Sequence, residues 1–328
     1  MSNNADPRRD QALVWAAQAL GKPCTIAKLA GDASFRRYFR LHCEGVSYVL
    51  MDAPPQHEDV KPFLCVLDWM GKAGLSIPAV IAKDSGLGFL LLGDFGDVTW
   101  AVHLMRGGDV GPMMADALRQ LHLLQAARPE SLHDFDVARM QRECDLYLDW
   151  YLPRVGAMTP SQRQRDDFHA ALLPVLNELA GLPRVPVHLD YHSRNLMLPA
   201  DGLPLGVIDF QDAVNGPVTY DLASLLYDCY QDYPESMRCE FSRQFFDGLP
   251  DASQAAFDGL DDWHRLLRLT AMQRHIKAIG IFARLAYRDG KRQFLDEIPL
   301  TRKHLREEMD ALGIDAHALI LLLKEPAA

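Results

Sequence analysis

The sequence lacks any apolar run that could cross a membrane. A transmembrane helix needs about 18 or more apolar residues in succession, and no segment of the 328 residues approaches that length. A usable export signal is also missing. Arg8-Arg9 precede apolar residues, but Asp10 and Gln18 interrupt them, and the pattern indicates an amphipathic helix that ends at Gly21. A cytoplasmic protein that does not associate with a membrane is therefore predicted.

Positive charge and paired cysteines are scarce as well. The chain has 34 Lys and Arg against 44 Asp and Glu, a formal charge of -10, which argues against binding to nucleic acid or to an anionic membrane surface. The six cysteines form no Cys-x-x-Cys pair and no spacing typical of metal ligands. Six reduced thiols are therefore predicted.

The first part of the chain is rich in predicted strands. Five segments with β-branched, aromatic and aliphatic residues are separated by turn signals. They are 25–29, 35–42, 46–52, 78–83 and 88–92. A helix is predicted over 60–72, and a glycine-bracketed connector follows at 93–97. The pattern predicts a β-rich lobe over 1–92, a hinge at 93–97 and a second lobe over 98–328.

The second lobe is predicted to be mostly helical. Apolar residues recur there at helical spacing, and Gly or Pro ends several of the segments. The predicted helices are 113–127, 139–152, 162–179, 220–230, 234–248 and 261–287, followed by one or two more over 299–323. A small β insertion is predicted at 187–209, so the fold class is α+β.

The β insertion carries the densest chemistry of the chain. Asp190 and Asn195 follow an apolar strand in the pattern His-x-Asp-x4-Asn, and Asp209 ends the next one. Phosphoryl transfer needs a carboxylate to orient and deprotonate a hydroxyl, together with metal ions that neutralise phosphate charge. Asp190 suits the first task, and Asn195 and Asp209 offer the oxygen ligands that Mg²⁺ prefers. The alternative is that all three are turn or capping residues.

Two neighbours of this set are predicted to be structural. His188 lies in the strand, where its side chain should point away from the reacting groups and hydrogen-bond the loop backbone. Asp221 stands at a predicted helix start, where a carboxylate accepts backbone N–H groups.

Three stretches together resemble the aminoglycoside phosphotransferase family of small-molecule kinases. They are 187–197, 207–210 and 216–222. The resemblance extends over nearly the whole chain and implies a two-lobed, protein-kinase-like fold, ATP and Mg²⁺ as cofactors, Asp190 as catalytic base, and Asn195 and Asp209 as metal ligands.

Further stretches resemble a bacterial subgroup of that family. They are 31–40, 51–55, 209–213 and 280–285. This subgroup phosphorylates the anomeric hydroxyl of N-acetylmuramate and N-acetylglucosamine in the recycling of cell-wall sugars, which implies an amino sugar as substrate. An aminoglycoside or another small alcohol is the alternative acceptor.

The nucleotide contacts are predicted from the first lobe. Gly31, Asp32 and Ser34 belong to a turn-prone loop that can bring backbone N–H groups to phosphates, and Asp94 and Phe95 belong to the connector expected beside adenine.

One expected cation is missing from the first lobe. Kinase-like folds usually carry a phosphate-binding lysine on the third strand, where this chain has Met51. Arg36 or Arg37 is the candidate replacement, and without the lysine the role of Glu58 stays open. A pseudokinase that binds nucleotide without catalysis is the contrasting prediction.

Substrate contacts are predicted around the catalytic residues and on a late helix. The candidates are His192, Arg194, Gln211, Asp212, Arg274 and Lys277. The positive charge of Arg274 and Lys277, one helical turn apart, would attract a carboxylate such as the lactyl group of N-acetylmuramate. The alternative is a solvated basic helix face.

Overall fold

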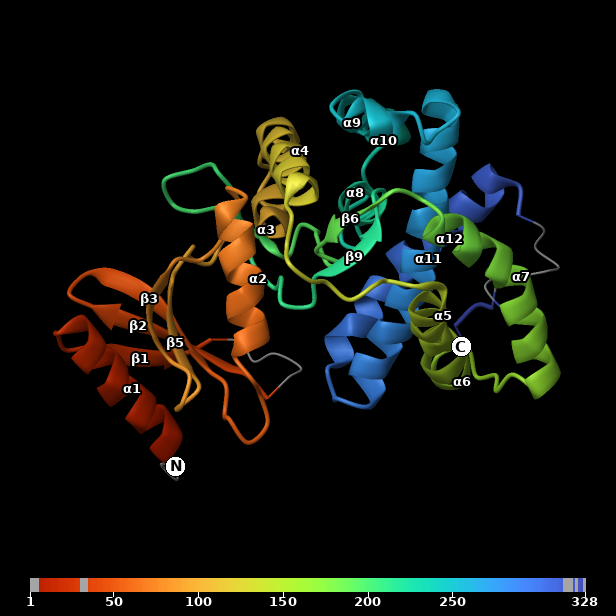
Figure 1. Ribbon diagram of the computed structural model, residues 1–328. Helices are drawn as coiled ribbons and strands as arrows, with labels where there is room; N and C mark the ends of the chain where they lie inside the picture. Colours follow the sequence, from red (N-terminus) through yellow and green to blue (C-terminus); the bar gives the residue numbers. More distant parts are fainter. Residues whose placement is uncertain (1–5, 30–34, 315–320, 322–323, 327–328) are drawn as a thin grey trace. The chain divides into compact units, whose positions relative to one another are not determined.

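The computed structural model describes residues 6–29, 35–314, 321 and 324–326. The chain divides into two compact units. Figure 1 is coloured along the sequence, so the segments of each unit can be found by residue number. Unit 1 consists of Met1–Val98 and Met197–Gln211, and unit 2 of Thr99–Leu196 and Asp212–Ala328.

Unit 1 is built on a five-stranded sheet in the order β1-β2-β3-β5-β4, with neighbouring strands antiparallel. The strands are β1 (Thr25–Lys28), β2 (Arg37–Cys43), β3 (Val46–Asp52), β4 (Val80–Asp84) and β5 (Phe89–Gly93). Two helices accompany them, α1 (Pro7–Leu20) and α2 (Lys61–Lys72). The predicted β-rich first part, with one helix between the third and fourth strands, is confirmed.

Alternation along the strands gives this sheet a buried face that α1 covers. Phe39 and Leu41 of β2 are packed with Leu50 of β3 and with Ala12 and Ala16 of α1. Small residues on the helix let it lie close to the sheet, which leaves the larger strand side chains to fill the space between them. Figure 1 shows α2 on the other side of the sheet from α1.

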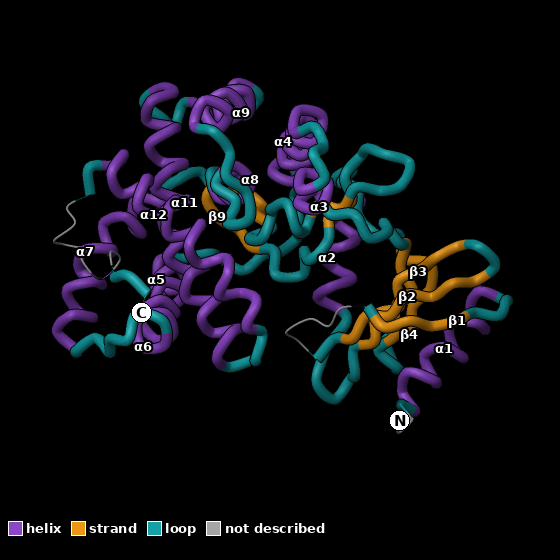
Figure 2. The backbone as a smooth tube through the Cα atoms, turned by 180° about the vertical axis from the view of Figure 1, so that it is seen from behind, coloured by secondary structure: helices purple, strands orange, loops and turns teal. Residues whose placement is uncertain are grey.

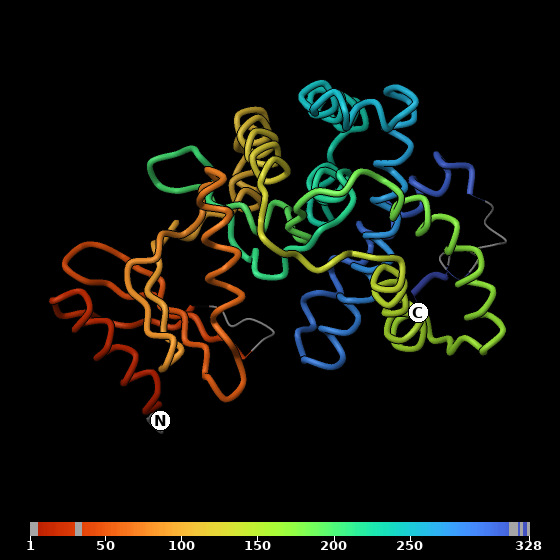
Figure 3. The backbone as a smooth tube through the Cα atoms, in the orientation of Figure 1, coloured from red at the N-terminus to blue at the C-terminus, as the bar shows by residue number. Residues whose placement is uncertain are grey.

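The second segment of unit 1 returns to it late in the sequence. β7 (Leu196–Met197) and β8 (Gly206–Val207) form a two-stranded sheet. The Val207 N–H donates to the Ser76 carbonyl at 2.7 Å, and the Leu198 N–H donates to the Val98 carbonyl at 2.7 Å. Figure 3 shows this green segment beside the orange part of the chain that includes α2. Backbone hydrogen bonds therefore attach it to unit 1.

The prediction of six free thiols is wrong for two cysteines. Cys24 and Cys43 form a disulfide, while Cys65, Cys144, Cys229 and Cys239 are free. Cys24 directly precedes β1 and Cys43 ends β2, and the pairing of Thr25 with His42 brings the two Cα atoms to 4.4 Å. Sequence spacing gave no sign of this pair, because antiparallel pairing creates the proximity.

Unit 2 is mainly helical, as predicted. Its helices are α3 (Trp100–Met105), α4 (Val110–Ala126), α5 (Val137–Leu146), α6 (Leu152–Arg154), α7 (Gln162–Ala180), α8 (Tyr220–Leu226), α9 (Glu235–Asp247), α10 (Asp251–Gln254), α11 (Gly259–Tyr287) and α12 (Ile298–Leu312), with a π-helical turn at Tyr147–Tyr151 and a 3₁₀ segment at Arg292–Glu297. A two-stranded antiparallel sheet pairs β6 (Arg184–Val187) with β9 (Val214–Pro217). Figure 2 shows α5 and α12 alongside the long α11.

Three predicted helical segments have different ends. In the segment predicted as one or two helices over 299–323, α12 ends at Leu312 and is capped by Gly313. The helix predicted over 139–152 becomes a π-helical turn at Tyr147, and Pro153 lies in the short α6 after it. A Cβ on Gly280 of α11 would lie only 2.4 Å from the Tyr147 nitrogen, so glycine is what lets the two backbones approach here. The helix predicted over 220–230 ends at Leu226.

Within the described ranges, no helix combines the length and the apolar character needed to cross a membrane.

Candidate active site

Residues 188–195 of unit 2 form the loop for which a catalytic role is predicted, and it is called the catalytic loop below. The loop begins at the end of β6 and is held there by one buried carboxylate. Asp221, at the start of α8, accepts the backbone N–H of His188 at 2.6 Å and that of Leu189 at 3.0 Å. Burial raises the pKa of Asp221 to about 6, although the two N–H donors and His188 act in the opposite direction. Asp221 thus fixes the first two residues of the loop through their backbone N–H groups.

The loop contains a backbone conformation that side chains rarely adopt. Leu189 has φ of 78°, in the left-handed region that normally favours glycine. The next residue, Asp190, donates its N–H to His188 Nδ1 at 3.3 Å, and the Tyr191 hydroxyl donates to the Ala117 carbonyl of α4 at 3.0 Å. Such strain persists only where the surroundings over-determine it, and here backbone and side-chain bonds on both sides do so.

Asn195 and Asp228 fix the remainder of the loop. The side-chain amide of Asn195 donates from Nδ2 to the Asp190 carbonyl at 2.9 Å, which orients Oδ1 as its remaining polar atom. Asp228, fully buried, accepts the N–H of Ser193 at 2.9 Å and that of Tyr230 at 2.9 Å. The loop carrying Asp190 and Asn195 is therefore rigidly supported at both ends.

Asp190 is half-buried among cations of unit 2. Burial raises the pKa of Asp190, but the charges of Lys277 and Arg274 and the nearby histidines more than offset it, so the pKa lies below the ordinary value of 3.8. The Asp190 carboxylate is therefore ionised at neutral pH, as a general base must be. Both Arg274 and Lys277 belong to α11, so the fold brings this predicted pair to the catalytic loop.

His192 and Arg194, the two loop residues predicted to contact the substrate, have different surroundings. Burial lowers the pKa of His192, so its ring is neutral at pH 7, and the ring lies edge-on to Tyr230 with centroids 5.2 Å apart. Arg194 is exposed and stacks over Tyr230, with its guanidinium carbon 3.7 Å from the ring centroid, while pairing with Glu297. Arg194 therefore already has two interaction partners within unit 2.

Asp209 lies at the end of the second segment of unit 1. Its φ of 64° is also in the left-handed region, and its Oδ1 accepts from Gln211 Nε2 at 2.8 Å. Phe210, between them, is buried with its ring 5.0 Å from that of Phe63 on α2. Asp209 and Asp212, on either side of this stretch, are exposed. The buried Phe210 therefore attaches an otherwise polar segment to α2.

The two arginines at the start of β2, Arg36 just before it and Arg37 as its first residue, have different partners, and both are called the strand arginines below. Arg37 forms two hydrogen bonds from Nε and Nη2 to Asp52 Oδ2, at 2.9 and 2.5 Å, and one from Nη1 to Asp6 at 2.6 Å. Asp52 is fully buried and also accepts from Arg8 at 2.7 Å. Arg37 is thus part of a structural ion-pair network.

Arg36 instead pairs with Glu58, which precedes α2. The distance from Arg36 Nη2 to Glu58 Oε2 is 3.3 Å, and the two side chains are 14% and 16% exposed. Met51, at the position where kinase-like folds carry lysine, is fully buried opposite Tyr38 and Leu90. An arginine–glutamate pair therefore exists in unit 1 although the strand lysine is absent.

The predicted connector is held by one further arginine. Arg40 donates to both carboxylate oxygens of Asp94, at 2.6 and 3.1 Å, and to Asp97 at 2.6 Å. Burial raises the pKa of Asp94, but the bonds from Arg40 and from the Gly96 N–H outweigh it and lower the pKa below 3.8. The ring of Phe95 lies against Gly206, where a Cβ would come within 2.3 Å of it. The predicted loop residues Gly31, Asp32 and Ser34 lie outside the described residues.

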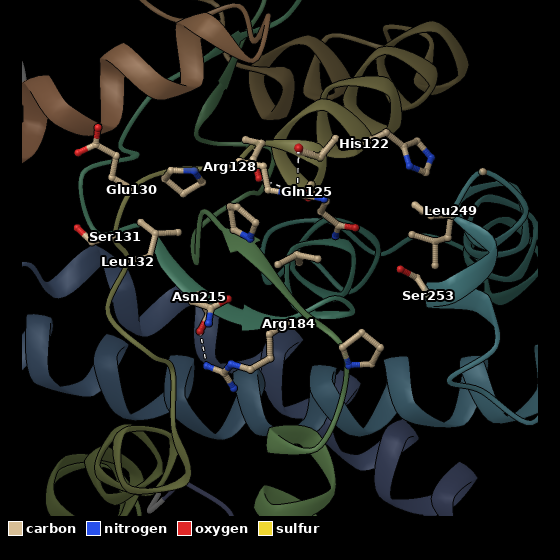
Figure 4. Close-up of a pocket in the computed structure, with 18 residues that line it drawn as sticks. His122, Gln125, Arg128, Glu130, Ser131, Leu132, Arg184, Asn215, Leu249 and Ser253 are labelled. Carbon is tan, nitrogen blue, oxygen red and sulfur yellow. Dashed lines mark hydrogen bonds between the residues drawn. The ribbon is translucent and has the colours of Figure 1, made fainter.

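A cavity in unit 2 lies apart from the catalytic loop. It has a volume of about 850 Å³, and the residues that line it come from the end of α4, the segment after it, β6, β9 and the stretch from Gly248 to Ser253. Figure 4 shows Gln125, Arg184 and Asn215 in its wall, with Arg184 donating to the Asn215 carbonyl. None of the predicted site residues is among the described residues that line it.

Some residues that support the site carry no recognisable sequence signal. Glu143 of α5 lies 3.4 Å from the Lys277 ammonium, and Asp228 and Glu297 hold Ser193 and Arg194 as described above. Each contacts a partner far away in the sequence, so only folding reveals the pair. The described residues hold no cluster of three His, Cys, Asp or Glu side chains typical of a metal centre, and Mg²⁺ usually needs only one or two protein oxygens.

With this geometry in place, sequence comparison identifies the family. Residues 25–268 match the phosphotransferase enzyme family, abbreviated APH. The chain belongs to the APH phosphotransferase family. Relatives named N-acetylmuramate/N-acetylglucosamine kinase include those of Pseudomonas aeruginosa, 37% identical with 89% of this chain and 87% of that protein covered, and of Pseudomonas putida, 34% identical with 86% and 83% covered.

Solved structures support the same family fold. An aminoglycoside phosphotransferase in ternary complex with AMP-PNP and hygromycin B matches with a TM-score of 0.56 and 15% identity, covering 92% of this chain and 99% of that one. A β-rich unit followed by a helical one is thus the architecture shared with APH phosphotransferases, and the predicted α+β, protein-kinase-like fold is confirmed.

Proposed function

We propose that this phosphotransferase uses ATP to phosphorylate the anomeric hydroxyl of N-acetylmuramate, N-acetylglucosamine or both, in the recycling of cell-wall sugars. The observation that carries the proposal is the likeness to kinases named for these two sugars, at 34 to 37% identity over more than four fifths of the chain. A cytoplasmic location stays a prediction that goes with it.

Asp190 is the proposed catalytic base. The anomeric oxygen attacks the γ-phosphorus of ATP as its proton passes to the Asp190 carboxylate, the bond between the γ-phosphorus and the bridging oxygen breaks, and ADP leaves. Two features support the role: the lowered pKa keeps the Asp190 carboxylate ionised, and the bonds to Asp221, Asp228 and Asn195 hold the loop in one conformation. Such preorganisation reduces the cost of aligning the reacting atoms.

Asn195 and Asp209 are the proposed ligands of Mg²⁺. Their donor atoms fit that ion, because Asn195 is oriented with Nδ2 on a carbonyl and Oδ1 left to coordinate, and Asp209 presents an exposed carboxylate in a fixed left-handed conformation. Bound there, the ion would neutralise phosphate charge during transfer.

Arg36 is the proposed replacement for the absent strand lysine. Its partner Glu58 precedes α2, as the partner of the lysine would, whereas Arg37 is committed to Asp52 and Asp6. The loop with Gly31, Asp32 and Ser34 is proposed to contribute backbone N–H groups to phosphates. The connector with Asp94 and Phe95 is proposed to bind adenine through its backbone, since the Asp94 side chain is occupied by Arg40.

The acceptor sugar is proposed to contact His192, Gln211 and Asp212. Arg194 was also predicted there, but its stacking on Tyr230 and its pair with Glu297 favour a role in supporting the loop. Met51 still motivates the contrasting pseudokinase function, against which the supported catalytic loop and the Arg36–Glu58 pair both argue.

A small-molecule phosphorylation screen tests the proposal. The purified full-length chain is incubated with ATP and Mg²⁺ and with N-acetylmuramate, N-acetylglucosamine, aminoglycosides and small alcohols, and the products are identified by mass spectrometry and phosphorus NMR. Sugar 1-phosphate from either amino sugar is expected. Its absence with both sugars would contradict the proposal, transfer to another acceptor would support the runner-up, and nucleotide binding without transfer would support a pseudokinase.

A further inference from the structure

Arg274 is a buried cation with donors that the described residues do not satisfy. It lies in the interior of α11 and is 6% exposed. Within the described part of the chain, neither Nε nor Nη1 of its guanidinium has a hydrogen-bond acceptor. Buried polar groups nearly always have partners, and a charged donor without one is costly. The unsatisfied Nε and Nη1 donors of Arg274 therefore suit a ligand that carries hydrogen-bond acceptors.

The surroundings of Arg274 keep it charged. Burial opposes the charge, but Tyr220, Cys229, Asp190 and Asp221 together raise its pKa above the ordinary value. The guanidinium carbon lies 5.5 Å from the centroid of the Tyr220 ring. Arg274 also ranks among the cations that lower the pKa of Asp190, so its charge acts close to the catalytic carboxylate.

Lys277, one turn further along α11, has partners for its charge within the protein, unlike Arg274. Its ammonium lies 3.4 Å from Glu143 Oε2 and 3.4 Å from the Tyr220 hydroxyl, and its side chain is 12% exposed. Glu143 therefore balances the charge of Lys277 within the protein. The pair accounts for the Lys277 side chain without any substrate.

Two other arginines, Arg284 and Arg288, lie further along this part of the chain, well away from Arg274. Arg284 is ten residues after Arg274, which at about 1.5 Å per residue separates them by roughly 15 Å along the axis, and Arg288 pairs with Asp289 at 2.7 Å. Of the basic residues at 274–288, Arg274 combines burial, unsatisfied donors and an interaction with Asp190.

We infer that Arg274 binds the carboxylate of an acidic amino sugar and so makes the enzyme favour N-acetylmuramate over the neutral N-acetylglucosamine. The inference rests on the proposed function and adds the residue that discriminates between its two sugars. A carboxylate accepts hydrogen bonds from a guanidinium with high geometric specificity. A neutral hydroxyl in its place leaves the donors unsatisfied, which is the arrangement that yields strong discrimination between substrates.

The test compares two sugars and three enzymes. kcat/KM is measured with ATP and Mg²⁺ for N-acetylmuramate and N-acetylglucosamine, in the wild-type chain, in Arg274→Gln and in the matched control Arg284→Gln. We expect Arg274→Gln to lower the ratio of kcat/KM for N-acetylmuramate to that for N-acetylglucosamine by about 10- to 100-fold, mainly through KM for N-acetylmuramate. Arg284→Gln should leave the ratio within about threefold, because its charge lies a long way along the helix.

A modified substrate makes the test independent of the folding of any variant. The methyl ester of N-acetylmuramate keeps the lactyl group and removes its charge. Wild-type enzyme should use the ester about 10- to 100-fold less well than the acid, and Arg274→Gln should use both about equally.

The possible failures can be distinguished. Equal use of acid and ester by the wild type, or an equal loss of activity toward both sugars in Arg274→Gln, would overturn the carboxylate assignment while leaving the kinase function intact. An equal loss would show that Arg274 acts only through Asp190. A wild-type enzyme that phosphorylates neither sugar would contradict the proposed function itself.

Discussion

The catalytic loop of unit 2 and the strand arginines of unit 1 are both rich in charge, but the fold holds them in opposite ways. In the loop, the buried carboxylates of Asp221 and Asp228 accept backbone N–H groups, so the backbone is fixed whatever the side chains do. At the start of β2, the guanidinium groups of Arg36 and Arg37 instead bind side-chain carboxylates. Loop residues should therefore affect turnover, and strand arginines should separate into one for binding and one for stability.

The largest expected effect is at the base. Asp190→Asn should lower kcat by at least about 10²-fold, since a positioned acid–base group contributes at least that much, while nucleotide affinity should change little. Steady-state kinetics and calorimetric binding of a non-hydrolysable ATP analogue measure both. The exposed Asp167→Asn on α7 is the control, and near-normal turnover in Asp190→Asn would refute the assignment of the base.

The strand arginines should give the next largest contrast. Arg36→Met should raise KM for ATP by about 10- to 100-fold, because a charge-assisted contact to phosphate is lost. Arg37→Met should instead lower the free energy of unfolding by about 1–3 kcal/mol, because the buried Asp52 then keeps only Arg8 as an ion-pair partner among the described residues. Kinetics and urea denaturation of both variants test this, and a KM effect confined to Arg37→Met would reverse the assignment.

Asp221→Asn probes the support of the loop without touching the base. It replaces a carboxylate that accepts two backbone N–H bonds, so we expect a loss of about 2–4 kcal/mol in unfolding free energy and a fall in kcat of about tenfold. Denaturation and kinetics at pH 7.5 measure both effects. If turnover falls as far as in Asp190→Asn while stability is unchanged, Asp221 has a direct chemical role instead.

The smallest effect is expected in the connector. Asp94→Asn should lower the free energy of unfolding at pH 7 by about 1–2 kcal/mol, since the bond to Arg40 loses its charge. The folded-state pKa of Asp94 is lowered, so its stabilisation is present above pH 3.8 and is lost as the pH falls through the lower folded value. Urea denaturation at pH 7, 5 and 3.5 should show a constant difference at the first two and a smaller one at the last. Asp97→Asn, 77% exposed, should change stability by less than about 0.5 kcal/mol.

The sequence predicted where strands and helices lie more reliably than it predicted which distant side chains contact each other. Alternating strands at 25–92 and helical spacing after residue 99 depend on neighbours within a few residues, and the structure matches both. Several helix ends differ from the prediction. The π-helical turn begins at Tyr147, where the backbone lies close to Gly280 of a distant helix, and nothing near residue 147 in the sequence signals that contact.

By itself, the sequence determined the order of the elements and placed Asp190, Asn195 and Asp209 in the pattern from which a catalytic role is predicted, because motif spacing and hydrophobic periodicity are local properties of the chain. Only the tertiary structure decided that Arg36 is the arginine that pairs with Glu58 and that Cys24 pairs with Cys43. It also decided that Glu143 balances the charge of Lys277, while Nε and Nη1 of Arg274 have no acceptor among the described residues. The physical reason is that charge compensation and burial depend on residues tens to more than a hundred positions apart. Their distances exist only once the chain has folded.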